Sequence, residues 1–97
     1  MEEKYTREEV LEISRNIVTG QRTDDYGQPE DSFDKIAKYW SVYLGRKITS
    51  LDVANMMMLL KMARMTNGGG SIDNYIDIAG YAACGGEIFG LLANDEK

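Results

Sequence analysis

The segment from residue 50 to residue 66 constrains the fold of this chain most. It follows the tetrapeptide T-S-L-D at 49–52, a capping box in which the Thr49 and Asp52 side chains each bind the backbone N–H of the other residue. From Val53 to Met65 the residues are apolar nearly all round a helix, as in a central helix that other helices or a second subunit cover on several sides. The sequence therefore predicts an all-α protein built around this helix, with its methionines in the core and at an oligomer interface rather than in a hydrophobic ligand groove.

Three further segments place apolar residues at helical spacing. The first begins at a T-R-E-E capping box whose cap is Thr6, and polar or glycine-containing stretches separate all of them. Together they predict a four-helix bundle-like single domain over residues 1–97, with helices at about 7–19, 29–44, 50–66 and 72–92.

Composition restricts the classes of function. The 97 residues carry a net charge of −5, which argues against binding to a nucleic-acid polymer, and there is no histidine to act as a general base or a transition-metal ligand. Cys84 is the only cysteine, so no intrachain disulfide can form. The charged N-terminus and the lack of an 18-residue apolar run predict a cytoplasmic protein without membrane contact. A chain this short has a modest core, so we expect a homo-oligomer.

Two cations and two acids lie on consecutive predicted helices. Lys61 and Arg64 share one face of the helix at 50–66, and Asp73 and Asp77 share one face of the next helix. A short turn between these helices predicts an antiparallel return that brings the acids towards the cations. Each cation must reach water, pair with a carboxylate or bind a ligand phosphate, because burying it alone is costly.

Glycines interrupt the last helix. Gly86 and Gly90 continue a four-residue repeat of small residues from Ala82, which favours close packing of another helix. Gly80 suits either helix packing or a notch for a ligand. Cys84 fits a small buried residue better than a nucleophile.

The loop at 20–28 contains an arginine and a tyrosine. Arg22 can bind a phosphate and Tyr26 can stack on a base. The alternative is a solvated arginine beside a tyrosine that anchors the loop.

Four motifs carry a resemblance to a family of small phage and prophage proteins, over residues 20 to 90. They are R-x-x-x-Y-G at 22–27, W-x-x-Y-L-G at 40–45, D-V-A-x-M-M-x-L-L-K-x-A-R at 52–64 and D-N-x-x-D-x-A-G-Y at 73–81. More remotely, the K-x-x-R and D-x-x-x-D layout is similar to nucleotide-modification-associated phage domains and to the all-α pyrophosphatases related to MazG. That resemblance implies a helical, oligomeric, MazG-like protein that handles nucleotides.

The chain departs from the MazG-like pattern at the metal site. MazG-like enzymes hold magnesium with an E-x-x-E pair and an E-x-x-D pair on two helices, whereas the helix at 50–66 offers only Asp52, which is already a cap. Asp73, Asp77 and Glu87 are a small set for a magnesium-assisted hydrolase. The leading hypothesis therefore includes no catalysis, no cofactor and no metal.

That hypothesis is a phage nucleotide-binding oligomer that sequesters a host nucleotide signal in a pocket between subunits. Its cations would meet phosphates, a tyrosine ring would stack on the base, and its acids and amide would bind the sugar or the base edge. The assigned residues are Arg22, Tyr26, Lys61, Arg64, Asp73, Asn74, Asp77 and Tyr81.

Two alternatives stay open. The first is a magnesium-dependent nucleoside triphosphate pyrophosphatase in which Asp73 and Asp77 hold the ion. The second is a structural helical adaptor in which Lys61, Arg64, Asp73 and Asp77 form an internal ion network.

Overall fold

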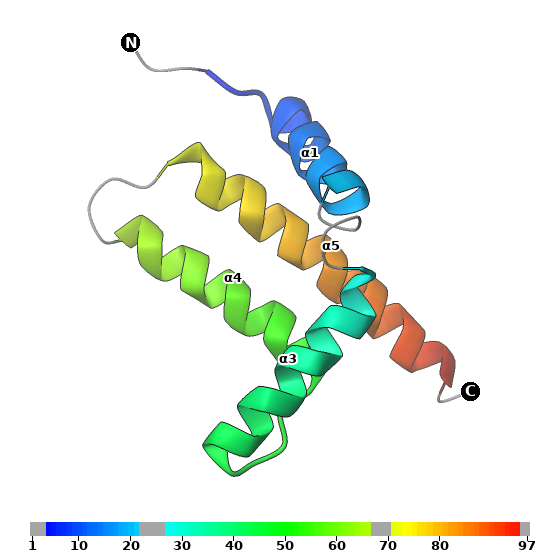
Figure 1. Ribbon diagram of the computed structural model, residues 1–97. Coiled ribbons are helices and arrows are strands. Elements are labelled where there is room, and N and C mark those ends of the chain that lie inside the picture. Colours follow the sequence, from blue (N-terminus) through cyan, green and yellow to red (C-terminus); the bar gives the residue numbers. More distant parts are fainter. Residues whose placement is uncertain (1–3, 22–26, 67–70, 96–97) are drawn as a thin grey trace.

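A computed structural model of the chain describes residues 4–21, 27–66 and 71–95, and the described residues form four α-helices and no strand (Figure 1). The all-α prediction is confirmed. The elements are α1 (Arg7–Asn16), a short π-helical turn η1 (Ile17–Gln21), α3 (Pro29–Leu44), α4 (Ser50–Thr66) and α5 (Ile72–Asp95).

Both predicted capping boxes are present. In α1 the Glu9 N–H donates to Thr6 Oγ1 at 3.1 Å, and the Thr6 N–H donates to Glu9 Oε1 at 3.2 Å. In α4 the Asp52 N–H donates to Thr49 Oγ1 at 3.0 Å, and the Thr49 N–H donates to Asp52 Oδ2 at 2.9 Å. These bonds satisfy backbone donors that the first turn of a helix leaves free, and they fix where each helix begins.

The first helix ends earlier than the expected residue 19. After Asn16 the chain continues as the wider turn η1. The Thr19 hydroxyl donates to the Arg15 carbonyl at 2.6 Å, and that carbonyl is the acceptor that the Thr19 N–H would use in an α-helix. The Thr19 side chain thus bonds to this carbonyl where the helix type changes, and the apolar spacing could not reveal the change.

The helices α4 and α5 run antiparallel and pack on each other as one layer. The helix α1 packs on α5 through Ser14 and Val18, which face Gly80, while α3 contributes Phe33 to a core that contains Cys84 and Ile88 of α5. Gly80, Cys84 and Ile88 lie on one stripe of α5 because they are four residues apart. Both α1 and α3 therefore lie on the same side of the layer, which we call the covered face.

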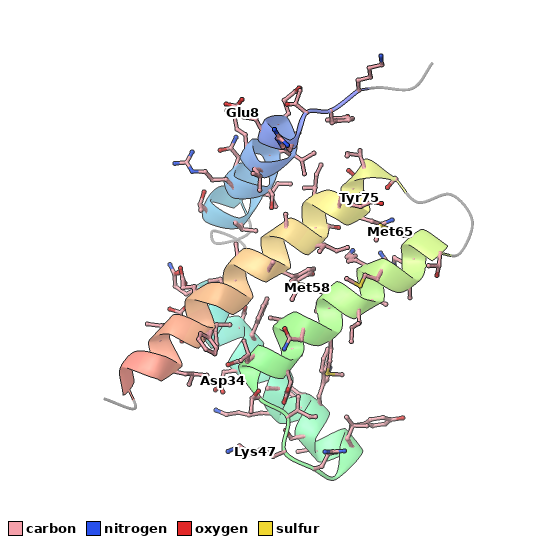
Figure 2. The ribbon with its side chains drawn as sticks, turned by 180° about the vertical axis from the view of Figure 1, so that it is seen from behind. Glu8, Asp34, Lys47, Met58, Met65 and Tyr75 are labelled. Atoms are coloured by element: carbon pink, nitrogen blue, oxygen red, sulfur yellow. The ribbon has the colours of Figure 1, made fainter. Side chains whose placement is uncertain are left out.

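No described element packs on the opposite side of the layer, which we call the open face. Figure 2, seen from behind, shows α4 in front of α3 and both α4 and α5 without a helix over them. The open face carries Leu59 and Met62 of α4 and Tyr75, Ala82, Gly86 and Phe89 of α5.

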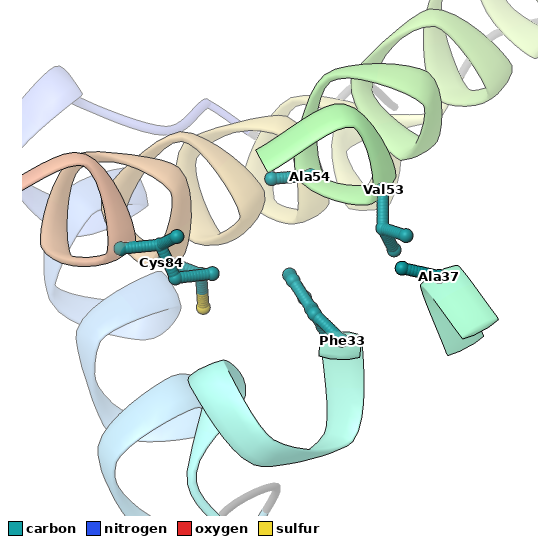
Figure 3. Close-up of a cluster of buried hydrophobic side chains, with 6 residues drawn as sticks. Phe33, Ala37, Val53, Ala54 and Cys84 are labelled. Carbon is teal, nitrogen blue, oxygen red and sulfur yellow. The ribbon is translucent and has the colours of Figure 1, made fainter. Parts of the chain in front are cut away.

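The core is small. It consists of Phe33 and Ala37 from α3, Val53 and Ala54 from α4, and Cys84 and Ile88 from α5 (Figure 3). Trp40 is half-buried and packs against this cluster. None of the described helices is long and apolar enough to cross a membrane.

Glycine permits close helix packing at positions other than those expected. A Cβ atom at Gly85 would lie 3.3 Å from the Ala54 Cβ, so α4 and α5 approach each other closely there. A Cβ atom at Gly86 or at Gly90 would have nothing within 4 Å. The prediction of close packing at Gly86 and Gly90 is therefore wrong for the described part of this single chain.

Candidate functional site

An ion pair joins the two helices of the layer. Lys61 Nζ of α4 lies 3.1 Å from Asp77 Oδ2 of α5, and only 13% of the Lys61 side chain is exposed, against 36% for Asp77. The antiparallel return of α5 along α4 creates this contact, as expected from the sequence. A largely buried ammonium group needs an anion, and Asp77 supplies it.

The Lys61–Asp77 pair forms part of the wall of a hollow of about 190 Å³ on the covered face. Apolar side chains and a few polar groups from three helical segments surround it. Its lining consists of Ser14 of α1, Ile17 and Val18 of η1, Lys61 of α4, and Ile76, Asp77, Gly80, Tyr81 and Cys84 of α5.

Gly80 sets the distance between α5 and the first helical segment. A Cβ atom there would lie 2.8 Å from Val18 Cγ1 and 3.3 Å from Ser14 Oγ, so a larger residue would push α1 and η1 outward. Of the two interpretations of Gly80, helix packing is shown. Because the same contact also borders the hollow, this packing shapes the candidate site.

Tyr81 contributes to the core and to the hollow. Its ring packs against Phe33 with the ring centroids 6.1 Å apart and the planes inclined by 36°. This contact holds the half-buried ring in place. Tyr81 therefore presents a positioned side chain to the hollow rather than a freely moving one.

Ser14 was missed by the sequence analysis. It is buried, with 5% exposed, and it brings a hydroxyl group to the lining of the hollow. The sequence signal for Ser14 was a serine among the apolar positions of the first helix. This signal does not show whether the serine lines a hollow or only packs in the core.

The remaining predicted site residues do not line this hollow. Arg22 and Tyr26 lie outside the described residues. Arg64 and Asp73 are exposed, and neither takes part in an ion pair with another described residue. Asn74 is half-buried, and its backbone N–H donates to the Ser71 carbonyl at 3.1 Å. The structure thus brings together Lys61, Asp77 and Tyr81 of the predicted set.

The described residues do not assemble a magnesium site. No group of three or more Asp, Glu, His or Cys side chains within residues 4–21, 27–66 and 71–95 is placed to hold a metal ion. Asp77 is paired with Lys61, and the Asp52 carboxylate accepts a bond from the Thr49 backbone. Of the metal set of the hydrolase alternative, Asp73 is exposed and Asp77 is engaged by Lys61.

A second surface, on α3, was also missed. Tyr39, Val42 and Tyr43 are 73%, 83% and 89% exposed, and with Lys35 and Lys38 they line a shallow apolar hollow. Lys38 Nζ forms an ion pair of 3.1 Å with Asp34 Oδ2, and both side chains are largely exposed. The spacing of the apolar residues in this helix indicates only its buried stripe.

The fold and the hollow define a small all-helical protein with a cation and an acid at a half-enclosed site. The chain belongs to the family described as a domain of unknown function, DUF6378, whose profile matches residues 9–89. It is 40% identical over 82 residues to the gene 55 protein of Mycobacterium phage D29, which covers 84% of this chain and 54% of the relative. It is 43% identical over 74 residues to the gene 55 protein of Mycobacterium phage L5, which covers 75% of this chain and 47% of the relative.

These relatives confirm the resemblance to a phage protein family. The chain spans about half the length of the relatives it matches. No solved structure matches this chain.

Proposed function

We propose that the chain binds a nucleotide without catalysis, as a homo-oligomer, and thereby sequesters a nucleotide signal of the host cell. One observation carries this proposal: the Lys61–Asp77 pair borders a hollow instead of being enclosed by packed side chains. A lysine held at such a wall can exchange its carboxylate partner for a ligand phosphate, since both are oxygen anions of similar hydrogen-bonding geometry.

The size of the hollow limits what it can hold. Small-molecule sites usually measure about 300–1,000 Å³, and the hollow measures about 190 Å³. It suits one part of a nucleotide, and we assign that part to a phosphate at Lys61. The rest of the nucleotide would extend outward past Arg64 and Asp73, which lie one helical turn from Lys61 and from Asp77.

The proposal places the phosphate at the hollow of a single chain, instead of in the pocket between subunits that the sequence led us to expect. The resemblance of the K-x-x-R and D-x-x-x-D layout to MazG-like enzymes is the sequence feature that favours nucleotide binding. The pyrophosphatase alternative would need metal ligands beyond those that the described residues bring together.

The test is calorimetric titration with a panel of mono-, di-, tri- and cyclic nucleotides. The proposal predicts binding of at least one of them and loss of that binding in Lys61→Met. The matched control is Lys38→Met, which removes the lysine of an exposed ion pair with the same 3.1 Å separation and should leave binding unchanged. Absence of binding across the panel, or equal binding by Lys61→Met, would contradict the proposal.

The same samples separate the alternatives. Chromatography after incubation with magnesium should return the bound nucleotide intact, whereas release of pyrophosphate would support the hydrolase. If no nucleotide binds and Lys61→Met changes only the free energy of unfolding, the ion pair has the structural role of the adaptor alternative.

A further inference from the structure

The exposed side chains on the open face of the α4–α5 layer are uncharged. A helix on the surface of a globular protein normally turns charged and polar residues towards water. On the open face the exposed side chains are apolar or small, with Leu59 62%, Tyr75 58% and Phe89 62% exposed. The adjacent exposed positions Asn55 and Thr66 are also uncharged. This surface therefore has the character of a protein interface.

The exposed charges described on α4 and α5 lie elsewhere. Glu87 lines a hollow with Val18 and Pro29, which places it towards the covered face. Asp73 is one helical turn before Asp77 on the same stripe, and Arg64 is three residues after Lys61. Among the charged side chains described on α4 and α5, only the half-buried Asp52, seven residues before Leu59, lies on the stripe of the open face, and its carboxylate is bound to the Thr49 backbone.

We propose that a second copy of this chain packs on the open face, so that two α4–α5 layers form a four-helix arrangement around a two-fold axis. This inference specifies the homo-oligomer of the proposed function. Each chain carries a net charge of −5, so two copies repel each other at long range. In a two-fold interface the same patch meets itself, and an uncharged patch does so without opposing like charges.

Small residues suit this contact. Ala82 and Gly86 are exposed in the middle of the α5 stripe, and apart from the neighbouring backbone of α5 itself no described atom lies within 4 Å of a Cβ placed at Gly86. A glycine inside a helix costs about 1 kcal/mol relative to alanine, so its presence needs a compensating contact. The described chain provides none at Gly86, and a helix of a second copy can approach closely there.

The area of the open face is close to the area that a specific dimer interface needs. The helices α4 and α5 have 17 and 24 residues, so at a rise of about 1.5 Å per residue they overlap over ~25 Å. With two helices side by side at about 10 Å each, the flat footprint is on the order of 500 Å². Projecting side chains add to this, which brings it near the ~800 Å² per partner of a standard specific interface.

The exposed surface of α3 is less suited to a second copy. Its tyrosines line the same hollow as Lys35 and Lys38, so a two-fold contact there would bring lysines of both chains together. The hollow at Lys61 lies on the covered face, so a dimer formed through the open face leaves both hollows accessible.

The test is the mass of the full chain in solution without nucleotide, by light scattering at tens of micromolar. The wild type should have twice the chain mass of 10.9 kDa, or a higher even multiple. In Leu59→Lys the mass should fall at least twofold. Leu11→Lys is the matched control, because Leu11 on α1 is also 62% exposed, and its mass should equal that of the wild type.

Two more variants make the test decisive. Ala82→Lys places a charge on the α5 side of the open face and should also lower the mass, while Tyr43→Lys on α3 should not. Circular dichroism shows which variants keep the helical fold, and only those are compared. A wild type with the mass of one chain, association retained in both Leu59→Lys and Ala82→Lys, or association lost in Tyr43→Lys would each overturn the proposal. Because no nucleotide is present, these outcomes do not depend on ligand binding.

Discussion

The covered and open faces of the α4–α5 layer consist of the same two helices and differ in chemistry. The covered face holds a mostly buried ion pair, a glycine in contact with α1 and η1, and a hollow. The open face holds exposed apolar and small residues without charge. Because α4 is apolar nearly all round, hydrophobicity alone does not separate its two faces. The positions of the charged residues do.

Replacing a phenylalanine on each face should give the largest difference in stability between the two faces. Phe33 is 1% exposed in the core under the covered face, and Phe89 is 62% exposed on the open face. Phe33→Ala should lower the free energy of unfolding by about 3–5 kcal/mol. Phe89→Ala should change that of the dissociated chain by less than ~0.5 kcal/mol. Urea titration at low protein concentration measures both, and similar losses would show that the two faces are not distinct in the single chain.

Glycine-to-alanine substitutions should change the stability by intermediate amounts, and the sign of the change should differ between Gly80 and Gly90. Gly80→Ala forces a Cβ against Val18 Cγ1 and Ser14 Oγ and should destabilise the fold by about 1–3 kcal/mol. Gly90→Ala meets nothing within 4 Å and should stabilise the helix by up to about 1 kcal/mol. Thermal unfolding reports both signs, and a stabilising Gly80→Ala would contradict the close approach of α1 and η1 to α5.

The two ion pairs give a smaller contrast. Asp77→Ala leaves the largely buried Lys61 without its acid and should cost about 1–2 kcal/mol, a reduced amount because Asp77 is itself 36% exposed. Asp34→Ala removes an exposed pair one helical turn apart on α3 and should cost about 0.3–0.5 kcal/mol. Urea titration measures the free energy of unfolding of both variants. If Asp77→Ala and Asp34→Ala lower it equally, water reaches Lys61 freely.

Local chemistry made most of the fold predictable. The capping boxes at Thr6 and Thr49 each fix a helix start through bonds within four residues. Pro29 begins α3, and Gly45 ends it with a φ of 68°, a left-handed conformation that glycine adopts easily. These signals depend on neighbours in the sequence, which is why the sequence revealed them.

The candidate site was predictable only in part. Spacing put Lys61 and Asp77 on facing helices, and the short connection between those helices predicted their contact. The contribution of Ser14 and Val18 to the hollow depends on how α1 and η1 pack across α5 at Gly80, which is a long-range contact. Close helix packing occurs at Gly80 and Gly85 and not at Gly86 and Gly90, and this too depends on how the helices pack across α5.

We propose that the two faces act separately, with the ligand on the covered face and the second copy on the open face. The most direct measurement is calorimetric titration of the Leu59→Lys variant with whichever nucleotide the wild type binds. We expect the variant to have the mass of a single chain and the wild-type Kd, because Lys61, Asp77 and Tyr81 all come from one chain. Loss of nucleotide binding together with loss of association, in a variant that keeps its helical fold, would contradict the account and indicate a pocket between subunits.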